Sequence, residues 1–183
     1  MAAWKPDNKR FTELLLVLSE RFADNPRFGA IKLNKLLFYC DFLSYAMLGR
    51  PLTGFEYQKR PHGPVPRGVL SIQSAMQQRG ELLIEEIRLP SGKVQHRSRN
   101  LRKPRLDVFS REELDIIDQI SRELSEHDAE SISNLSHLEV GWKAASEYET
   151  IPYGTVYLSD QSLSQVAIEN AQRFAREHGY STQ

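Results

Sequence analysis

The chain has 183 residues, 40% hydrophobic and 26% charged, a composition that excludes a disordered or fibrous protein. It offers no run of roughly 18 apolar residues to span a bilayer and no signal-peptide core at its polar start, and its single Cys40 excludes an internal disulfide. Formal net charge is +0, but residues 50–106 carry 12 basic against 4 acidic residues and residues 107–183 carry 5 against 15. We expect one cytoplasmic domain, residues 1–183. Its basic middle and acidic final part either steer different partners or pair with one another within the fold.

Two helices are predicted in the first quarter of the chain. Asp7 is an N-cap residue type, and apolar residues follow it at helical spacing. A second helix is predicted from Ala30 to Leu48, ended by Gly49. Its inward-facing residues are predicted to be Leu33, Leu36, Leu37, Cys40, Leu43 and Met47. Aromatic residues on neighbouring faces favour a helix sandwiched between others, with an aromatic face kept for a partner as the alternative.

An irregular segment, a third helix and a β-hairpin are predicted for residues 50–99. Residues 50–66 are rich in proline and glycine, with one short strand within Phe55–Arg60. Pro66 suits the first turn of a third helix that continues to Gly80. The segments Leu82–Leu89 and Val94–Arg99 flank Pro-Ser-Gly-Lys, which predicts a β-hairpin.

Helices are predicted in the remainder of the chain. Ser110 and Glu113 form a capping-box pattern that opens a fourth helix, and Asp128 caps a fifth, short helix that ends near His137. Ser159 or Asp160 opens a final amphipathic helix that ends near Gly179. The predicted fold class is therefore mainly α (α+β): a bundle of about six helices with a small antiparallel hairpin or three-stranded sheet.

Signatures of catalysis and metal binding are missing from the sequence. It holds no P-loop, G-x-G-x-x-G, H-E-x-x-H, C-x-x-C or G-x-S-x-G pattern, and its histidines lack metal-ligand spacing. We therefore predict no enzyme activity, no cofactor and no metal site. An enzyme that uses His62 or His137 as general base is the weakest hypothesis, because no nucleophile or acid accompanies either residue.

One loop has a composition that restricts its backbone. In Arg60-Pro61-His62-Gly63-Pro64-Val65-Pro66, three prolines and a glycine favour a single fixed bend. Such a loop either presents recognition residues or only routes the chain from strand to helix, and both interpretations stay open. For His137 and Trp142 we favour a structural interpretation, in which both anchor a helix end to the core.

A basic arm follows the predicted hairpin and consists of Arg97, Arg99, Arg102, Lys103 and Arg105. Such residues could reach nucleic-acid phosphates or an acidic protein. Helix, turn, helix and hairpin also resemble a winged helix in outline, so a DNA-binding transcriptional regulator is the alternative function. The predicted 66–79 helix offers only Arg67 and Arg79 as basic residues, which weakens that alternative.

Three motifs carry a family resemblance: Lys32-Leu33-Asn34-Lys35-Leu36-Leu37-Phe38-Tyr39, Gly49-Arg50-Pro51-Leu52 and Gly63-Pro64-Val65-Pro66. Their order and spacing resemble the Panacea, or SocA-like antitoxin, domain, with its K-L-x-K-L-L-[YF] helix, G-x-P-L turn and Y-G-P-V loop. Leu135-Ser136-His137 with Trp142 is similar to a later element of that family, so the resemblance is strongest over residues 30–145. The family more often has tyrosine at His62 and Gly-Pro before Trp142, and we interpret both departures as marks of a divergent branch.

The resemblance implies a type II antitoxin that binds and neutralises a protein toxin from a neighbouring gene, by occlusion or by delivery to a protease. A contact ledge of Tyr57, Arg60, His62, Pro64 and Arg67, with exposed aromatics of the second helix, is predicted to meet the toxin, because tyrosine and arginine are enriched at interaction hot spots. Lys32, Lys35, Gly63, His137 and Trp142 are predicted to be structural. We expect Lys32 and Lys35 at the exposed edge of their helix, paired with acidic residues of the final third.

Overall fold

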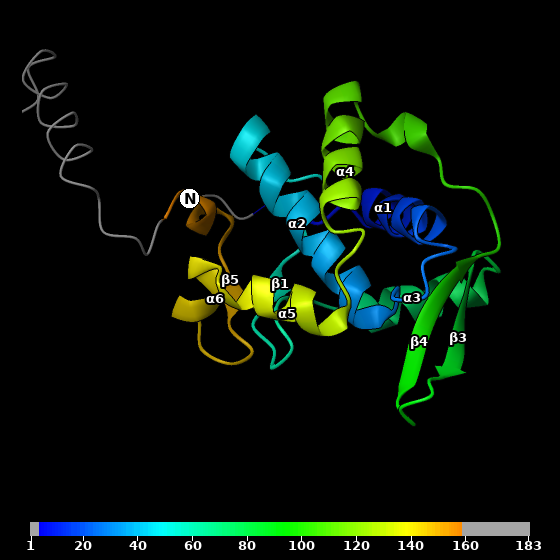
Figure 1. Cartoon of the computed structure of the whole chain (residues 1–183). Helices are drawn as coiled ribbons and strands as arrows, with labels where there is room; N and C mark the ends of the chain where they lie inside the picture. The colour runs from blue at the N-terminus through cyan, green and yellow to red at the C-terminus, as the bar shows by residue number, and fades with distance from the viewer. Residues whose placement is uncertain (1–3, 159–183) are drawn as a thin grey trace, which may run out of the picture.

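The structure is a computed structural model that describes residues 4–158, and Figure 1 shows the arrangement of its elements. The α-helices are α1 (Asn8–Arg21), α2 (Ala30–Leu48), α3 (Val69–Gln78), α4 (Arg111–Glu123), α5 (Ala129–His137) and α6 (Val140–Ala144). The strands are β1 (Tyr57–Gln58), β2 (Val65–Pro66), β3 (Leu82–Arg88), β4 (Val94–Asn100) and β5 (Thr150–Ile151). Two short 3₁₀ helices, η1 (Leu106–Val108) and η2 (Tyr153–Tyr157), complete the described elements.

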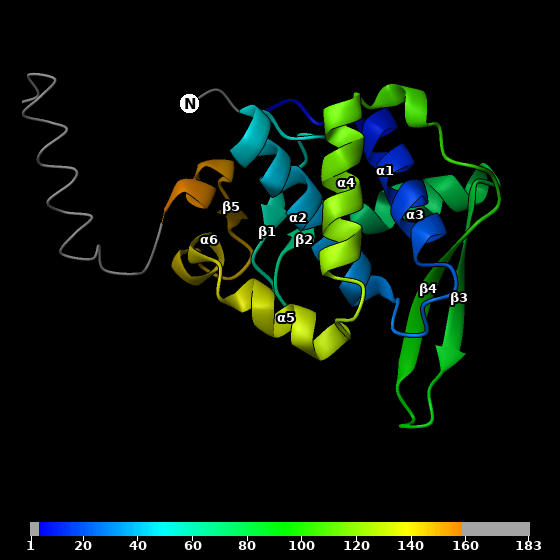
Figure 2. The same ribbon diagram turned by 45° about the horizontal axis from the view of Figure 1, so that its top comes forward.

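Helix α2 is the central element, with α1, α4, α5 and η2 packed around it (Figure 2). Its buried residues lie on several faces and include Leu33, Leu36, Leu37, Phe38, Cys40 and Phe42. The prediction that this helix is sandwiched between others is therefore confirmed, as are its bounds and its end at Gly49, which adopts a left-handed φ of 70°. Met47 was predicted to face inward, and this was wrong: it is 59% exposed, because it lies in the last turn of α2.

The predicted helix caps are present at three N-termini. The Asp7 side chain accepts a hydrogen bond from the backbone N–H of Arg10 at the start of α1. Ser110 and Glu113 form the complete capping box of α4, and Asp128 caps α5. These local contacts satisfy backbone N–H groups that have no partner within the helix, so the three helix starts were predictable from short sequence patterns.

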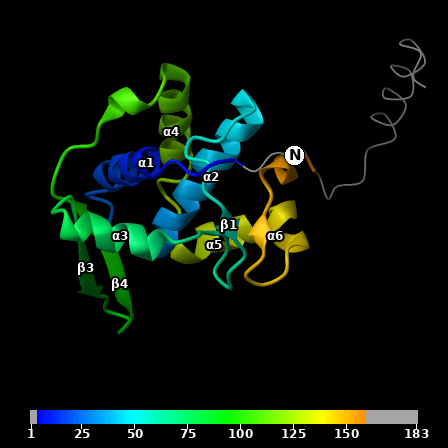
Figure 3. The ribbon, with the colours of Figure 1, turned by 180° about the vertical axis from the view of Figure 1, so that it is seen from behind.

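Two antiparallel sheets supply the β-structure. Strands β3 and β4 form the predicted hairpin, with Leu82 opposite Asn100, and it lies beside α3 at the opposite end of the molecule from α6 and β5 (Figure 3). A second sheet has the order β2-β1-β5. Pro66 was predicted to open the third helix, and this was wrong: it lies in β2 opposite Tyr57, and α3 begins only after Gly68. An edge strand accepts proline because its outer side needs no N–H donor.

The predicted class, mainly helical α+β with small antiparallel sheets, is confirmed. The predicted final helix from Ser159 or Asp160 lies outside the described residues, and the short helix α6 was not predicted. Within residues 4–158, no helix is long and apolar enough to cross a membrane.

Candidate partner-binding surface

The segment between β1 and β2, residues 59–64, is here called the His62 loop. It turns tightly at Gly63, whose N–H donates to the Arg60 carbonyl over 2.8 Å and whose φ of 94° is one that L-residues rarely adopt. From α5, the Ser133 hydroxyl donates to the His62 carbonyl over 3.1 Å. The bend that the composition predicted is therefore held by contacts from outside the loop.

Lys35 supports this loop from beneath. Its side chain is 1% exposed, and its Nζ donates to the Pro64 carbonyl over 3.2 Å. Burial lowers the pKa of Lys35 to about 7, because a charged ammonium is disfavoured away from water. A Cβ added to Gly63 would lie 2.5 Å from Cε of Lys35 and also against Oγ of Ser136. The loop thus fits closely over α2 and α5.

Because Lys35 is buried, we expect the free energy of unfolding to depend on pH. Its pKa is lower in the folded chain than its ordinary value of 10.5, so above pH 7 the unfolded chain binds more protons and the free energy of unfolding rises with pH. Relative to Lys35→Met, the wild type is expected to gain about 2 kcal/mol between pH 7 and pH 9. Urea unfolding at several pH values measures the difference, and exposed Lys93→Met is the control, with a constant difference expected. A constant difference for Lys35→Met as well would contradict the prediction.

His137 and Trp142 support the loop from its other side. Their rings stack with centroids 4.0 Å apart, and the Trp142 indole N–H donates to the Arg60 carbonyl over 3.4 Å. Lys59 lies over the Trp142 ring, with Nζ 4.3 Å from its centroid. Burial is the main cause that lowers the pKa of His137, and the nearby charges of Lys35, His62 and Lys59 lower it further. The neutral imidazole is therefore favoured. The two rings thus connect α5 and α6 to the loop backbone.

The outer face of the loop includes a residue that the sequence reading missed. Tyr148 is 55% exposed, and the Arg60 guanidinium lies 4.3 Å from its ring centroid. Tyr148 has a φ of 66°, unusual for a bulky residue, and is held by bonds from its N–H to the Lys59 carbonyl (3.0 Å) and from Gln58 Nε2 to its own carbonyl (2.8 Å). No motif or spacing marks a tyrosine in this polar stretch, so only the fold brings it beside Arg60.

The predicted contact ledge is only partly at the surface. Arg60 is half-buried, and His62 and Arg67 are exposed, with Arg67 paired to Glu56 over 2.9 Å. Placing Tyr57 and Pro64 on the ledge was wrong. Tyr57 is 0% exposed because β1 turns its ring towards α2, and Pro64 is buried over Lys35. Both residues position the loop and do not present a side chain to a partner.

Asp41 is a second position that the sequence reading missed, and it connects α2 to the chain before β1. The carboxylate is 0% exposed and accepts hydrogen bonds from the Thr53 N–H (2.6 Å), the Thr53 hydroxyl (2.5 Å) and the Tyr57 hydroxyl (2.7 Å). Burial raises the pKa of Asp41 to about 6, against the lowering effect of these donors. An acidic residue in an otherwise apolar helical run was the available signal.

The expectation for Lys32 and Lys35 was wrong in environment and in partner. Lys32 is 0% exposed, and its Nζ donates to the carbonyls of Ser125 and His127, each over 2.7 Å. Burial lowers the pKa of Lys32 to about 8. The carbonyls that Lys32 contacts follow the end of α4, where backbone acceptors have no helical partner. Lys35 donates to the Pro64 carbonyl, so both lysines bond to backbone oxygens and not to carboxylates.

The arginines of the basic arm have partners within the chain. Arg97 donates to the carbonyls of Phe22, Ala23 and Asn25. The carboxylate partners are Glu85 for Arg99, Glu13 and Glu81 for Arg102, and Asp107 for Arg105, while Lys103 is exposed. DNA binding stays a prediction that this pairing does not favour. A steep loss of DNA affinity between low and physiological salt is the measurement that tests it.

The described residues define a mainly helical α+β protein in which buried polar contacts hold one exposed loop in a fixed bend. The chain belongs to the family described as antitoxin SocA-like, Panacea domain, whose model matches residues 33–143. The matched range includes Lys35, the His62 loop, His137 and Trp142. No curated protein and no solved structure matches the chain.

Proposed function

We propose that this protein is the antitoxin of a type II toxin–antitoxin pair, and that it neutralises a protein toxin from a neighbouring gene by direct binding through the outer face of the His62 loop. Family membership supports an antitoxin role and a non-enzymatic one. The observation that carries the site is that Arg60 and His62 reach the surface from a loop whose backbone is held by Lys35, Ser133 and Trp142.

A preformed loop favours tight binding for an entropic reason. Association orders flexible segments at a free-energy cost, and a segment that is already ordered in the free protein avoids most of that cost. The backbone of residues 60–64 is bonded to α2, α5 and α6 before any partner arrives. Arginine and tyrosine, here the stacked pair Arg60 and Tyr148, are the residue types most enriched at binding hot spots.

The charge of the loop indicates the chemistry of the toxin surface. None of the ion pairs within residues 4–158 involves Lys59, Arg60 or His62. The Lys59 ammonium lies over the Trp142 ring and donates to the Ala145 carbonyl, and the Arg60 guanidinium lies over the Tyr148 ring. An acidic toxin surface would supply the missing carboxylates, and such complementarity raises the association rate and selects the partner. Neutralisation then follows by occlusion of the toxin or by its delivery to a protease.

The double substitution Arg60→Ala with His62→Ala tests the site. It is expected to weaken binding to the co-expressed product of the neighbouring gene about 30-fold, because it removes the exposed donors while leaving the contacts beneath the loop. Binding is measured by calorimetry, neutralisation by growth after toxin induction, and stability by thermal unfolding, which should change little. Arg88→Ala with His96→Ala, an exposed pair of the same residue types on the hairpin, is the matched control. Full neutralisation by the loop variant would reject this site.

A further inference from the structure

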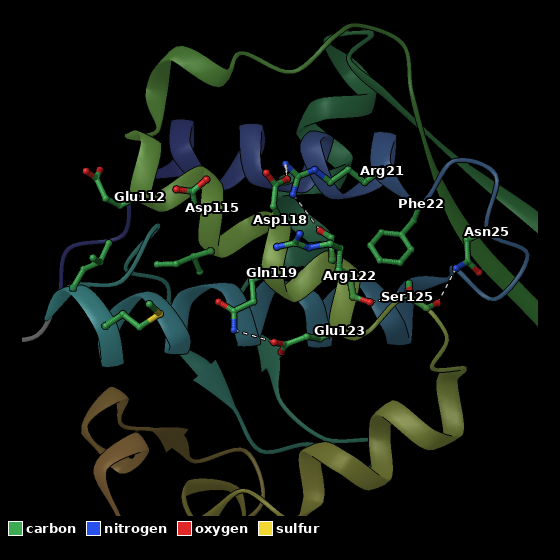
Figure 4. A pocket seen from close by; sticks show the side chains of 14 residues that line it. Arg21, Phe22, Asn25, Glu112, Asp115, Asp118, Gln119, Arg122, Glu123 and Ser125 are labelled. Atoms are coloured by element: carbon green, nitrogen blue, oxygen red, sulfur yellow. Dashed lines mark hydrogen bonds and ion pairs between the residues drawn. The ribbon is translucent and has the colours of Figure 1, made fainter.

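A groove of about 1020 Å³ follows α4, from Glu112 in its first turn to Ser125 just past its end (Figure 4). Arg21, Phe22 and Asn25 from the end of α1 and the turn after it line one part, and Met47 and Leu48 from the end of α2 line another. No residue of the His62 loop lines the groove, so it is a separate surface.

The apolar lining of the groove is buried except at the end of α2. Phe22 and Ile116 are 3% exposed and lie within its wall. Met47 is 59% exposed, although the helix around it is largely buried. Methionine is flexible and polarizable, and it adapts to the shape of an incoming apolar side chain. Helices that bind in grooves do so through an apolar face, and Met47 offers such a face a contact at one end of this groove.

The rest of the lining is predominantly acidic. Four carboxylates line the groove, Glu112, Asp115, Asp118 and Glu123, against two cations, Arg21 and Arg122. Asp118 pairs with Arg21, whereas Asp115 has no partner among the described residues. Glu112, Asp115, Gln119 and Glu123 recur at spacings of three and four residues, so they form one stripe along α4. Negative charge therefore accompanies the apolar groups along the whole length of the helix.

We propose that this groove binds a basic amphipathic helix of a partner protein. Apolar side chains of the partner helix would contact Met47 and Leu48, and its lysines or arginines would pair with Glu112, Asp115 and Glu123. The groove extends along 13 residues of α4, about 20 Å at 1.5 Å per residue, the length of a helix of three to four turns. This is a second interaction surface, and it does not depend on binding at the His62 loop.

A second copy of the chain fits the groove less well. Among its described residues, the basic-arm arginines already have internal partners, such as Glu85 for Arg99 and Glu13 for Arg102, while Arg60 and Arg88 lie in a loop and a strand and not on a helix. A partner that brings its own unpaired cations satisfies the groove without breaking those contacts.

Two fluorescein-labelled helical peptides test the proposal on the full chain. Both carry leucines at helical spacing, and the remaining positions are lysine in one and glutamate in the other. In anisotropy titrations the lysine peptide is expected to bind at least about 10-fold more tightly than the glutamate peptide. Asp115→Lys with Glu123→Lys should weaken the lysine peptide at least about 10-fold and favour the glutamate peptide, while Met47→Gln should weaken both, because it removes an apolar contact.

The control separates binding in the groove from attraction to exposed carboxylates elsewhere on the chain. Glu130→Lys with Glu147→Lys changes the same number of charges at exposed carboxylates outside the groove, and it should alter binding less than about threefold. An equal loss in both double variants would overturn the proposal. So would a dimer in light scattering that Met47→Gln dissociates, or a large gain in peptide binding on Arg173→Glu with Arg176→Glu, which would assign the groove to the chain's own C-terminal residues.

Discussion

Replacing Gly63 with alanine is expected to lower the free energy of unfolding by about 4 kcal/mol, the largest effect of any substitution proposed for this protein. Two costs add at this position. The φ of 94° strains an L-residue, and the new Cβ would lie 2.5 Å from Lys35 Cε and also against Ser136 Oγ. Neither neighbour can move freely, because Lys35 is 1% exposed and Ser136 is 0% exposed. Urea unfolding measures the loss.

Gly92→Ala separates the two costs of that substitution. Gly92 lies in the hairpin turn with a φ of 81°, and nothing lies within 4 Å of an added Cβ. Its replacement should therefore cost only the strain, about 1 kcal/mol. If Gly63→Ala were no worse than Gly92→Ala, crowding by Lys35 and Ser136 would not constrain the loop. Gly63→Ala should also weaken toxin neutralisation at temperatures where the variant remains folded, because the loop must shift.

Asp41→Ala is expected to lower the free energy of unfolding by about 3 kcal/mol. The substitution leaves the Thr53 N–H and the Tyr57 hydroxyl buried without an acceptor, although both now bond to Asp41. Asp41→Asn keeps one acceptor oxygen for the Thr53 N–H and places an amide N–H beside the hydroxyls of Thr53 and Tyr57, which can accept, so it should cost less than half as much. Thermal and urea unfolding at pH 7 provide the comparison.

Asp115→Ala is the matched control for Asp41→Ala. Asp115 is exposed and has no partner among the described residues, so its replacement should change stability by less than about 0.5 kcal/mol. A loss at Asp41 as small as that at Asp115 would show that the buried carboxylate contributes little to holding α2 against Thr53 and Tyr57.

Local patterns predicted most of the described helices and the hairpin. Asp7, Ser110 with Glu113, and Asp128 cap neighbouring N–H groups, and the bounds of α2 follow from its apolar run and from Gly49. Helix α6 was missed because five residues carry too little periodicity for a helix prediction. Proline suits both the first turn of a helix and an edge strand. Pro66 was therefore assigned to a helix start in error, and only its pairing with Tyr57 shows that it lies in a strand.

The candidate surface was only partly predictable. The motifs identified the family and directed attention to the His62 loop, of which Arg60 and His62 do reach the surface. Tyr57 was misplaced because side-chain direction in a strand of two residues depends on which face α2 covers. Tyr148 was missed because 88 residues of sequence separate it from Arg60, and no short-range pattern can report such a contact.

Short-range patterns were enough to predict the N-caps of α1, α4 and α5, the bounds of α2, the hairpin, the α+β class and the family, because capping, periodicity and motif order act over a few neighbouring residues. The environment of Lys32, Lys35 and Asp41 depends on packing between distant segments and could not be predicted from short-range patterns. A charged residue in an apolar helix is either exposed or buried against a polar partner, and here those partners are backbone carbonyls and hydroxyls from distant segments. Long-range packing supplied those acceptors and donors, and it turned the two lysines of the family motif from expected surface cations into supports for the chain above them.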